Sequence, residues 1–381
     1  MPSMTNSHAR AAAVTALTLL AALLPVVPAH AVRTEIVARG LQDAWSIAFL
    51  ADGRRLVTEK GGRLRVMTAD GRLGAPLAGL PAISVNGQCG LLDVAVDPQF
   101  ARNQRIFFTF AEPGSRGNST AVARARLVGT AGSERLEEVR TIFSQRPKMD
   151  SGAHCGSRIV FDRSGHLLVG LGDRFTGKAD AQNLGNHIGK VIRIDAEGRA
   201  PADNPFVGPS TGRAAAAPEV WSLGHRNIQG MALHPLTGDL WATEHGPQGG
   251  DEINLVRAGR NYGWPLVTYG RNYGIGTRIG EPGPKPGYEQ PLRHWVPTSI
   301  APSGLAFVTS DRYPAWKGKA LMGALRAEAL LLLTLEGNRV TGEERLLEDL
   351  GKRIRDVRQG PDGYLYVLTD GGSGQLLRLL P

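Results

Sequence analysis

Hydrophobic and polar residues alternate with a period of two along many short segments of the chain. The first such segments, residues 45–49 and 55–59, are separated by the turn Asp52-Gly53. Alternation of this kind, bounded by Gly, Pro or Asp turns, is typical of antiparallel β-strands. The strand-turn-strand unit recurs, and we count six copies, whose first strands begin near Trp45, Leu91, Arg158, Gly230, Ser303 and Ile354.

Six repeats of this kind predict a β-propeller. One small antiparallel sheet cannot bury both of its faces, whereas six sheets around an axis cover one another and protect their edges. We therefore expect an all-β fold, a six-bladed β-propeller with four-stranded antiparallel blades, formed by residues 32–381 as a single domain. A pair of β-sandwiches is the alternative, but sandwiches do not predict this internal similarity. In a propeller, loops at one end of the channel converge and can build one site.

The composition supports this prediction and excludes several other classes. Of 381 residues, 42% are hydrophobic and 49 are Gly, which argues against intrinsic disorder and favours many tight turns. Only 2 residues are Cys, too few for a small domain stapled by disulfides. The sequence has neither a Walker P-loop nor a His-Glu-x-x-His motif. It also has no basic run interleaved with aromatic residues, so nucleic acid is not an expected partner.

Residues 1–31 have the three-part layout of a secretory signal peptide. A polar start that carries Arg10 precedes an apolar run from Ala11 to Val27, and Ala29-His30-Ala31 matches a small-x-small cleavage site. The alternative is an uncleaved membrane anchor, for which the run is slightly short and is interrupted by Pro25. We expect cleavage, export to the periplasm or the medium, and no membrane span in the mature chain.

Candidate chemistry lies in the loops between the repeats, which are richer in polar residues than turns require. A channel mouth that carries Arg226, Arg326, Arg353 and Arg355 would suit a ligand with several carboxylates or phosphates. His154 is a candidate general base near neutral pH, although a single loop His is more often structural. Glu252 lies in a Gly-rich loop that resembles a hard-cation site, without the spacing of an EF-hand.

The ordered set of motifs resembles the soluble quinoprotein sugar dehydrogenases. The motifs that carry the resemblance are GHRNIQG at 224–230, EHGP at 244–247, GDEINL at 250–255, NYGWP at 261–265, RIRD at 353–356 and GPDGYLYVLTD at 360–370. Members of this family are secreted six-bladed propellers that carry pyrroloquinoline quinone (PQQ) and calcium, and the resemblance covers essentially the whole mature chain. It implies an oxidoreductase that oxidises aldose sugars at the anomeric carbon to the lactone, by hydride transfer to the quinone. The electron acceptor, a quinone or a cytochrome, stays unidentified, and we expect a monomer or a homodimer.

The resemblance also implies roles for individual residues. His154 matches the base that removes the proton of the anomeric hydroxyl, and Asp173 matches the carboxylate that orients this base. The carbonyls of Gly246 and Pro247 match ligands of the catalytic calcium. Glu252 and the carbonyl of Tyr262 match ligands of a second, structural calcium. The quinone-binding positions match Gln88, Arg226, Asn227, Tyr273, Arg353 and Arg355, and Arg326 stands where the family usually has Lys.

Two further expectations depend on this resemblance. The only cysteines, Cys89 and Cys155, directly follow Gln88 and His154, two positions that the resemblance assigns to one pocket. An exported protein meets oxidising conditions, so we expect a Cys89–Cys155 disulfide; two free buried thiols are the alternative. Other functions for such a fold are a non-catalytic binding module and a calcium-dependent sugar lactonase. Retention of His154 and of the arginine cluster favours the dehydrogenase.

Overall fold

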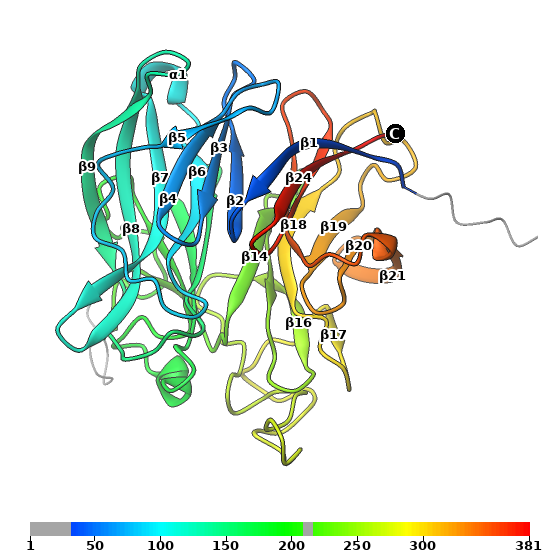
Figure 1. Ribbon diagram of the computed structural model, residues 1–381. Coiled ribbons are helices and arrows are strands. Elements are labelled where there is room, and N and C mark those ends of the chain that lie inside the picture. Colours follow the sequence, from blue (N-terminus) through cyan, green and yellow to red (C-terminus); the bar gives the residue numbers. More distant parts are fainter. Residues whose placement is uncertain (1–31, 209–215) are drawn as a thin grey trace, which may run out of the picture. The chain divides into compact units, whose positions relative to one another are not determined.

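The computed structural model describes residues 32–208 and 216–381 and confirms the six-bladed β-propeller (Figure 1). The described chain forms six separate sheets, and each sheet has four antiparallel strands. The predicted signal peptide, residues 1–31, lies outside the described residues. In the part of the chain that the structure describes, no helix has the length and apolar character needed to cross a membrane.

Five of the blades are built from four consecutive strands each. Blade 1 contains β2 (Ala44–Phe49), β3 (Arg55–Glu59), β4 (Arg63–Met67) and β5 (Leu73–Pro76). Blade 2 contains β6 (Leu91–Val96), β7 (Arg105–Gly114), β8 (Gly117–Val128) and β9 (Arg135–Ser144). Blade 3 contains β10 (Gly156–Phe161), β11 (Leu167–Leu171), β12 (Lys190–Ile194) and β13 (Val220–Leu223).

The remaining two of these five blades follow the same order. Blade 4 contains β14 (Ile228–Leu233), β15 (Leu240–Glu244), β16 (Asp251–Val256) and β17 (Arg293–Trp295). Blade 5 contains β18 (Pro302–Phe307), β19 (Ala320–Ala324), β20 (Ala329–Glu336) and β21 (Arg339–Leu346). The described helices are short and lie in loops: α1 (Phe100–Asn103), η1 (Lys178–Gln182) and η2 (Glu348–Leu350).

The sixth blade joins the two ends of the described chain. It contains β22 (Ile354–Gln359), β23 (Leu365–Thr369), β24 (Gly374–Leu379) and, as its outermost strand, β1 (Thr34–Leu41). β1 lies beside β24 in antiparallel register, with Thr34 opposite Leu379 (Figure 1). This pairing closes the ring with backbone hydrogen bonds, so the last blade does not depend on side-chain packing alone.

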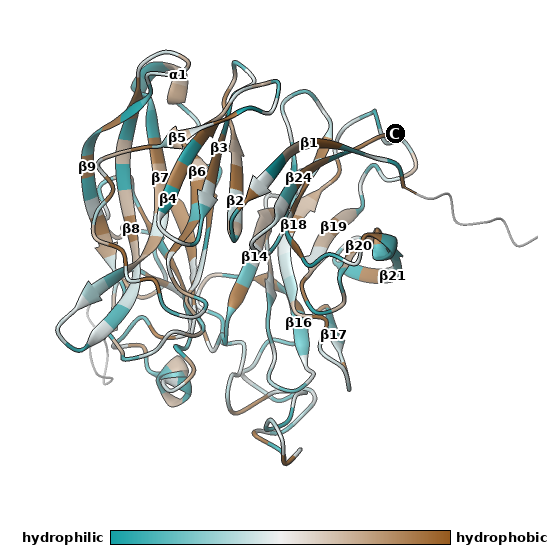
Figure 2. Cartoon of the chain, in the orientation of Figure 1, coloured by the Kyte–Doolittle hydropathy of each residue, from teal (hydrophilic) through white to brown (hydrophobic). Residues whose placement is uncertain are grey.

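Hydrophobic clusters fill the space between neighbouring blades. One cluster joins Ile47 and Val57 of blade 1 to Tyr366 and Leu368 of blade 6, and all four side chains are buried. Outer strands such as β9 instead carry both hydrophobic and hydrophilic residues, because one face meets solvent (Figure 2). The core is therefore a ring of interfaces between blades, as radial packing of sheets requires.

Each inner strand carries a register irregularity at its start. The pairing of the first strand with the second is shifted after Ala44, Leu91, Gly156, Ile228, Pro302 and Ile354, in the six blades in turn. A bulge of this kind turns an extra side chain out of the regular alternation. The displaced residues include Trp45, Gln229 and Arg355, which line a cavity described below.

A network of buried charges connects the inner strands across the axis. Arg158 of β10 is 1% exposed and lies 3.2 Å from carboxylate oxygens of both Asp93 of β6 and Asp356 of β22. Arg358 pairs with the same two carboxylates at 3.2 and 3.1 Å. Ser46 of β2 donates to Asp93 at 2.5 Å. Four blades are thereby tied together by groups that must stay paired because they are buried.

We expect Asp93→Ala to lower the free energy of unfolding by about 3–5 kcal/mol, since it leaves the buried Arg158 and the partly buried Arg358 without one of their two carboxylate partners. Urea denaturation followed by circular dichroism measures the change. Asp52→Ala is the control, because Asp52 forms an exposed ion pair with Arg54 that contributes at most about 1 kcal/mol. Equal losses in the two variants would contradict a special role of the axial network.

Candidate active site

His154 and Asp173 form a buried pair at one end of the channel. His154 lies in the loop just before β10, and Asp173 follows β11, the strand that pairs with β10. Their Nδ1 and Oδ1 atoms are 2.6 Å apart, and the side chains are 7% and 1% exposed. A methyl group on Gly172 would collide with the carbonyl oxygen of His154, so only glycine allows the two loops to approach this closely.

Asp173 is fixed in place by two further donors. Its Oδ1 accepts the backbone N–H of Phe175 at 2.8 Å, and its Oδ2 accepts the indole N–H of Trp264 at 2.7 Å. The hydrogen bond to this carboxylate places the imidazole proton of His154 on Nδ1. Nε2 of His154 therefore carries the lone pair, as a general base requires.

The environment keeps His154 neutral. Burial lowers the pKa of His154 below its usual value, and the Arg226 charge lowers this pKa further, while the hydrogen bond to Asp173 acts in the opposite direction. A neutral imidazole that is held by a carboxylate is ready to accept a proton at ordinary pH.

Two cavities lie around this pair. The first, which we call the base cavity, has a volume of about 120 Å³ and is lined by His154, Asp173, Phe175, Lys178, Arg226, Pro247, Trp264, Asn272, Tyr273 and Ile279. The second, the arginine cavity, has a volume of about 160 Å³ and is lined by Trp45, Lys60, Gly87, Gln88, Cys155, Gln229, His245, Leu325, Arg353, Arg355 and Asp370.

The donors around these cavities are only partly used. Arg226 donates to the carbonyls of His245 and Gly246 at 2.8 and 2.6 Å, and Arg355 donates to Gln229 at 3.1 Å and pairs with Asp370 at 3.3 Å. Among the described residues, buried Nε of Arg226, Nε of Arg355 and Nδ2 of Asn227 find no hydrogen-bond partner. Unpaired buried donors are costly and call for an acceptor, which fits a ligand with several carboxylates.

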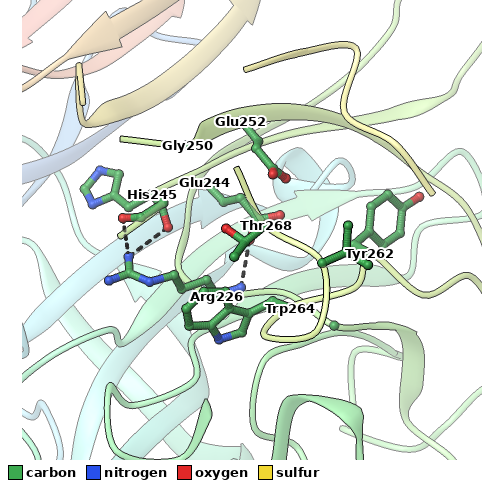
Figure 3. A pocket seen from close by; sticks show the side chains of 11 residues that line it. Arg226, Glu244, His245, Gly250, Glu252, Tyr262, Trp264 and Thr268 are labelled. Atoms are coloured by element: carbon green, nitrogen blue, oxygen red, sulfur yellow. Dashed lines mark hydrogen bonds between the residues drawn. The ribbon is translucent and has the colours of Figure 1, made fainter. Parts of the chain in front are cut away.

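A third, smaller pocket is acidic. We call it the acidic pocket; Figure 3 shows Arg226, Glu244, Glu252, Tyr262 and Trp264 around it. Asn254 bridges the two carboxylates, donating to Glu244 at 2.9 Å and to Glu252 at 3.1 Å. Burial and the neighbouring Glu244 raise the pKa of Glu252 to about 8. Two carboxylates that repel each other beside carbonyl oxygens suit a hard cation such as calcium.

The loop between β15 and β16 separates the three spaces. Gly246 donates its N–H to Asp251 at 2.8 Å, and the other carboxylate oxygen of Asp251 accepts the N–H groups of Ile300 and Ala301. Arg226 lines both the base cavity and the acidic pocket, and His245 lines both the arginine cavity and the acidic pocket. Burial lowers the pKa of His245 to about 3, so its side chain adds no charge there.

The expected disulfide is present between Cys89 and Cys155, whose Cα atoms are 5.8 Å apart. Cys155 lines the arginine cavity, so the bond links the Gln88 loop to the His154 loop at the wall of the site. Gln88 adds a second link, because its side-chain oxygen accepts the backbone N–H of His154 at 2.9 Å. The bond and the amide together hold the base loop against blade 2.

Comparison with known proteins gives a consistent answer. The glucose/sorbosone dehydrogenase family model matches residues 41–378. The chain is 45% identical over 354 residues to aldose sugar dehydrogenase YliI of Escherichia coli, covering 92% of this chain and 93% of that protein. A crystal structure of a glucose dehydrogenase has a TM-score of 0.87 at 47% identity, covering 92% and 99% of the two chains. A PQQ-bound aldose sugar dehydrogenase of Streptomyces coelicolor has a TM-score of 0.75 at 27% identity, covering 92% and 98%.

The chain belongs to the glucose/sorbosone dehydrogenase family. It is therefore an oxidoreductase, and the resemblance inferred from the sequence motifs is confirmed. The roles that the resemblance implies for single residues stay predictions, which we compare below with the positions of those residues.

Most of the predicted residues of this family member lie together at one end of the propeller. His154, Asp173, Arg226, Pro247 and Tyr273 line the base cavity. The arginine cavity takes in Gln88, Arg353 and Arg355. The acidic pocket takes in Gly246, Glu252 and Tyr262.

Two predicted residues lie outside these linings. Asn227 is buried and accepts the N–H of Gly156 at 3.2 Å, so it supports the wall of the site from behind. Arg326 is exposed and is not among the residues that line the three spaces, although its neighbour Leu325 lines the arginine cavity.

Several lining residues were not singled out from the sequence. Gln229, His245, Trp264 and Asp370 all stand inside or beside the motifs quoted above, so the signal was available in those motifs. No motif marks the other lining residues as part of a site, because they lie in sequences typical of ordinary strands and loops; these are Trp45, Lys60, Phe175 and Lys178.

We expect the double variant Cys89→Ser, Cys155→Ser to lower the free energy of unfolding by about 4 kcal/mol, because the disulfide closes a loop across 66 positions. Urea denaturation of the oxidised protein and of the variant measures the difference. Wild-type protein reduced with a thiol serves as the control and should resemble the variant. Two titratable thiols in denatured, unreduced wild-type protein would contradict the disulfide.

Proposed function

We propose that the protein is a PQQ- and calcium-dependent dehydrogenase that oxidises aldose sugars at the anomeric carbon to the lactone. The observation that carries this proposal is the buried His154–Asp173 pair beside cavities lined by Arg226 and Arg355, whose buried Nε atoms have no hydrogen-bond partner among the described residues. The PQQ-bound structure of the Streptomyces coelicolor relative supports the cofactor, and the name of the Escherichia coli relative supports the substrate class.

PQQ is a planar tricarboxylate. It would be held by three arginines, Arg226, Arg353 and Arg355, together with Gln88, Asn227 and Tyr273. Planar guanidinium groups match carboxylates with two parallel hydrogen bonds, which fixes orientation as well as affinity. Arg326, which is exposed, would keep the positive charge of the family lysine. When bound, the quinone supplies a two-electron acceptor for the hydride of the sugar, and calcium polarises its carbonyl.

The protein's own contribution to the reaction is proton removal. Nε2 of His154 accepts the proton of the anomeric hydroxyl, which prepares the anomeric carbon to lose hydride. Asp173 then stabilises the imidazolium that forms, because its Oδ1 lies 2.6 Å from Nδ1. Trp264 and the N–H of Phe175 hold Asp173, so the pair does not have to reorganise during the reaction.

Calcium would bind at two places. The carbonyls of Gly246 and Pro247 would hold the catalytic ion, and the Gly246 carbonyl also accepts a hydrogen bond from Arg226 at 2.6 Å. Glu252 and the Tyr262 carbonyl would hold the structural ion in the acidic pocket. The charge of that ion would relieve the repulsion between Glu244 and Glu252.

The proposal extends to the location and partners of the enzyme. We take residues 1–31 to direct export to the periplasm or the medium, where an oxidising compartment allows the Cys89–Cys155 bond to form. A quinone or a cytochrome would accept the electrons after each turnover.

Reconstitution tests the proposal directly. We expect the purified protein to bind one equivalent of PQQ in the presence of calcium and to reduce a dye with aldoses. His154→Ala should bind PQQ with the same stoichiometry while kcat falls by about 10²–10⁴-fold, because the base is lost. His166→Ala is the matched control, since His166 also faces an aspartate, Asp162 at 3.6 Å, but lies outside the cavities.

The pH profile provides a second check of the base. Activity needs the neutral imidazole, so kcat/KM should fall as pH drops through the lowered pKa of His154, which puts the acid limb below pH 6.5. Asp173→Asn should shift this limb to still lower pH and reduce kcat. If the purified protein hydrolyses lactones and does not bind PQQ, the proposed dehydrogenase function is wrong and the protein is a lactonase.

We expect calcium to raise the melting temperature and Glu252→Gln to remove this rise. The same variant should raise the melting temperature of calcium-free protein, because it removes the repulsion with Glu244. Differential scanning calorimetry with calcium or a chelator measures both effects. Glu289→Gln is the control, since Glu289 pairs with Arg260 at 3.5 Å outside the acidic pocket. An unchanged calcium response in Glu252→Gln would contradict the assignment.

A further inference from the structure

Two consecutive residues after Asp173 have a left-handed backbone. Arg174 has φ 59° and Phe175 has φ 65°, and neither is glycine. Such conformations are unfavourable for residues with a side chain and persist only where the surroundings enforce them. The position of this strained pair next to the carboxylate that orients the base suggests that it serves the site.

The side chain of Arg174 anchors the pair. Its guanidinium is fully buried and donates to the side-chain oxygen of Asn118 and to the carbonyl of Ser151, both at 2.5 Å. It also contacts both sulfur atoms of the disulfide between Cys89 and Cys155. Together with the bond from the Phe175 N–H to Asp173, these contacts fix the backbone on both sides.

The result of this anchoring is an aromatic ring at the mouth of the base cavity. Phe175 is 52% exposed, so its ring contributes little to the core. The ring lies nearly perpendicular to the imidazole of His154, at an angle of 76° and a distance of 5.2 Å between centroids. Tyr273 and Ile279 are further apolar surfaces in the same lining. An exposed aromatic ring that strain holds beside a base points to a ligand.

We propose that Phe175 determines substrate specificity by packing against the C–H face of an aldopyranose whose anomeric hydroxyl meets Nε2 of His154. This inference depends on the proposed function and names its substrate class, a six-membered sugar ring. Aromatic side chains combine a large apolar area with an electron-rich face, which suits the polarised C–H groups of a pyranose. Short open-chain aldehydes present no such face and gain nothing from the ring.

Steady-state kinetics with D-glucose and with glyceraldehyde tests the proposal. Phe175→Ala should raise KM for D-glucose by about tenfold, the loss expected for part of one buried aromatic contact, and leave kcat unchanged. KM for glyceraldehyde should stay the same. Phe175→Tyr should restore the wild-type KM for D-glucose, because it keeps the ring.

A glycine variant separates the ring from the backbone. Phe175→Gly removes the strain as well as the ring, since glycine adopts positive φ freely. It should show the same KM as Phe175→Ala. Leu236→Ala is the matched control, because Leu236 is 84% exposed and lies in the turn between β14 and β15, outside the three spaces.

Saturation-transfer NMR provides a readout that needs no cofactor. In protein without PQQ, saturation of aromatic protons should transfer to the C–H protons of D-glucose, and Phe175→Ala should lose most of this transfer. Unchanged KM and unchanged transfer in Phe175→Ala would overturn the proposal. A shifted pH profile at constant KM would also overturn it, because Phe175 would then act through the base. Failure of wild-type protein to bind PQQ would instead count against the proposed function, while the NMR result would still decide the role of Phe175.

Discussion

The buried charges on the channel axis are the interaction on which the rest of the structure depends. Arg158 and Arg358 share the carboxylates of Asp93 and Asp356, and these four side chains come from inner strands of three blades. Hydrophobic interfaces hold each blade to its neighbours, but they allow sliding, whereas paired charges in a buried position specify one arrangement. The axial network therefore fixes how the blades are set around the channel.

The site is built on top of this network by the bulges of the inner strands. Trp45 packs over the guanidinium of Arg158 at 4.4 Å, and Arg158 in turn donates to the carbonyl of Gln229. Gln229 accepts from Arg355, which brings the chain of contacts into the arginine cavity. In a regular strand these side chains would simply alternate between the two faces of the sheet. The bulges break this alternation and direct the side chains into the lining of the arginine cavity.

The fold could be predicted from the sequence because period-two alternation and turn residues repeat six times. Residues such as His154 and Arg226 could be predicted because they stand in motifs. Trp264 acts on Asp173 across 91 positions, and Arg174, which anchors Phe175, donates to Ser151 across 23 positions, so neither contact leaves a local pattern. The one-residue shifts at the bulges also could not be predicted from the sequence, because hydrophobic and polar residues alternate in the same way on either side of each bulge.

The pairing of β1 with β24 has a consequence for biosynthesis. A ribosome makes Thr34 long before Leu379, yet these residues are partners in the completed blade. The ring therefore cannot close while the chain is being made, and long-range pairing of this kind is slow. The ring therefore forms only when two strands made far apart in time have met, a constraint that the five blades built from consecutive strands do not share.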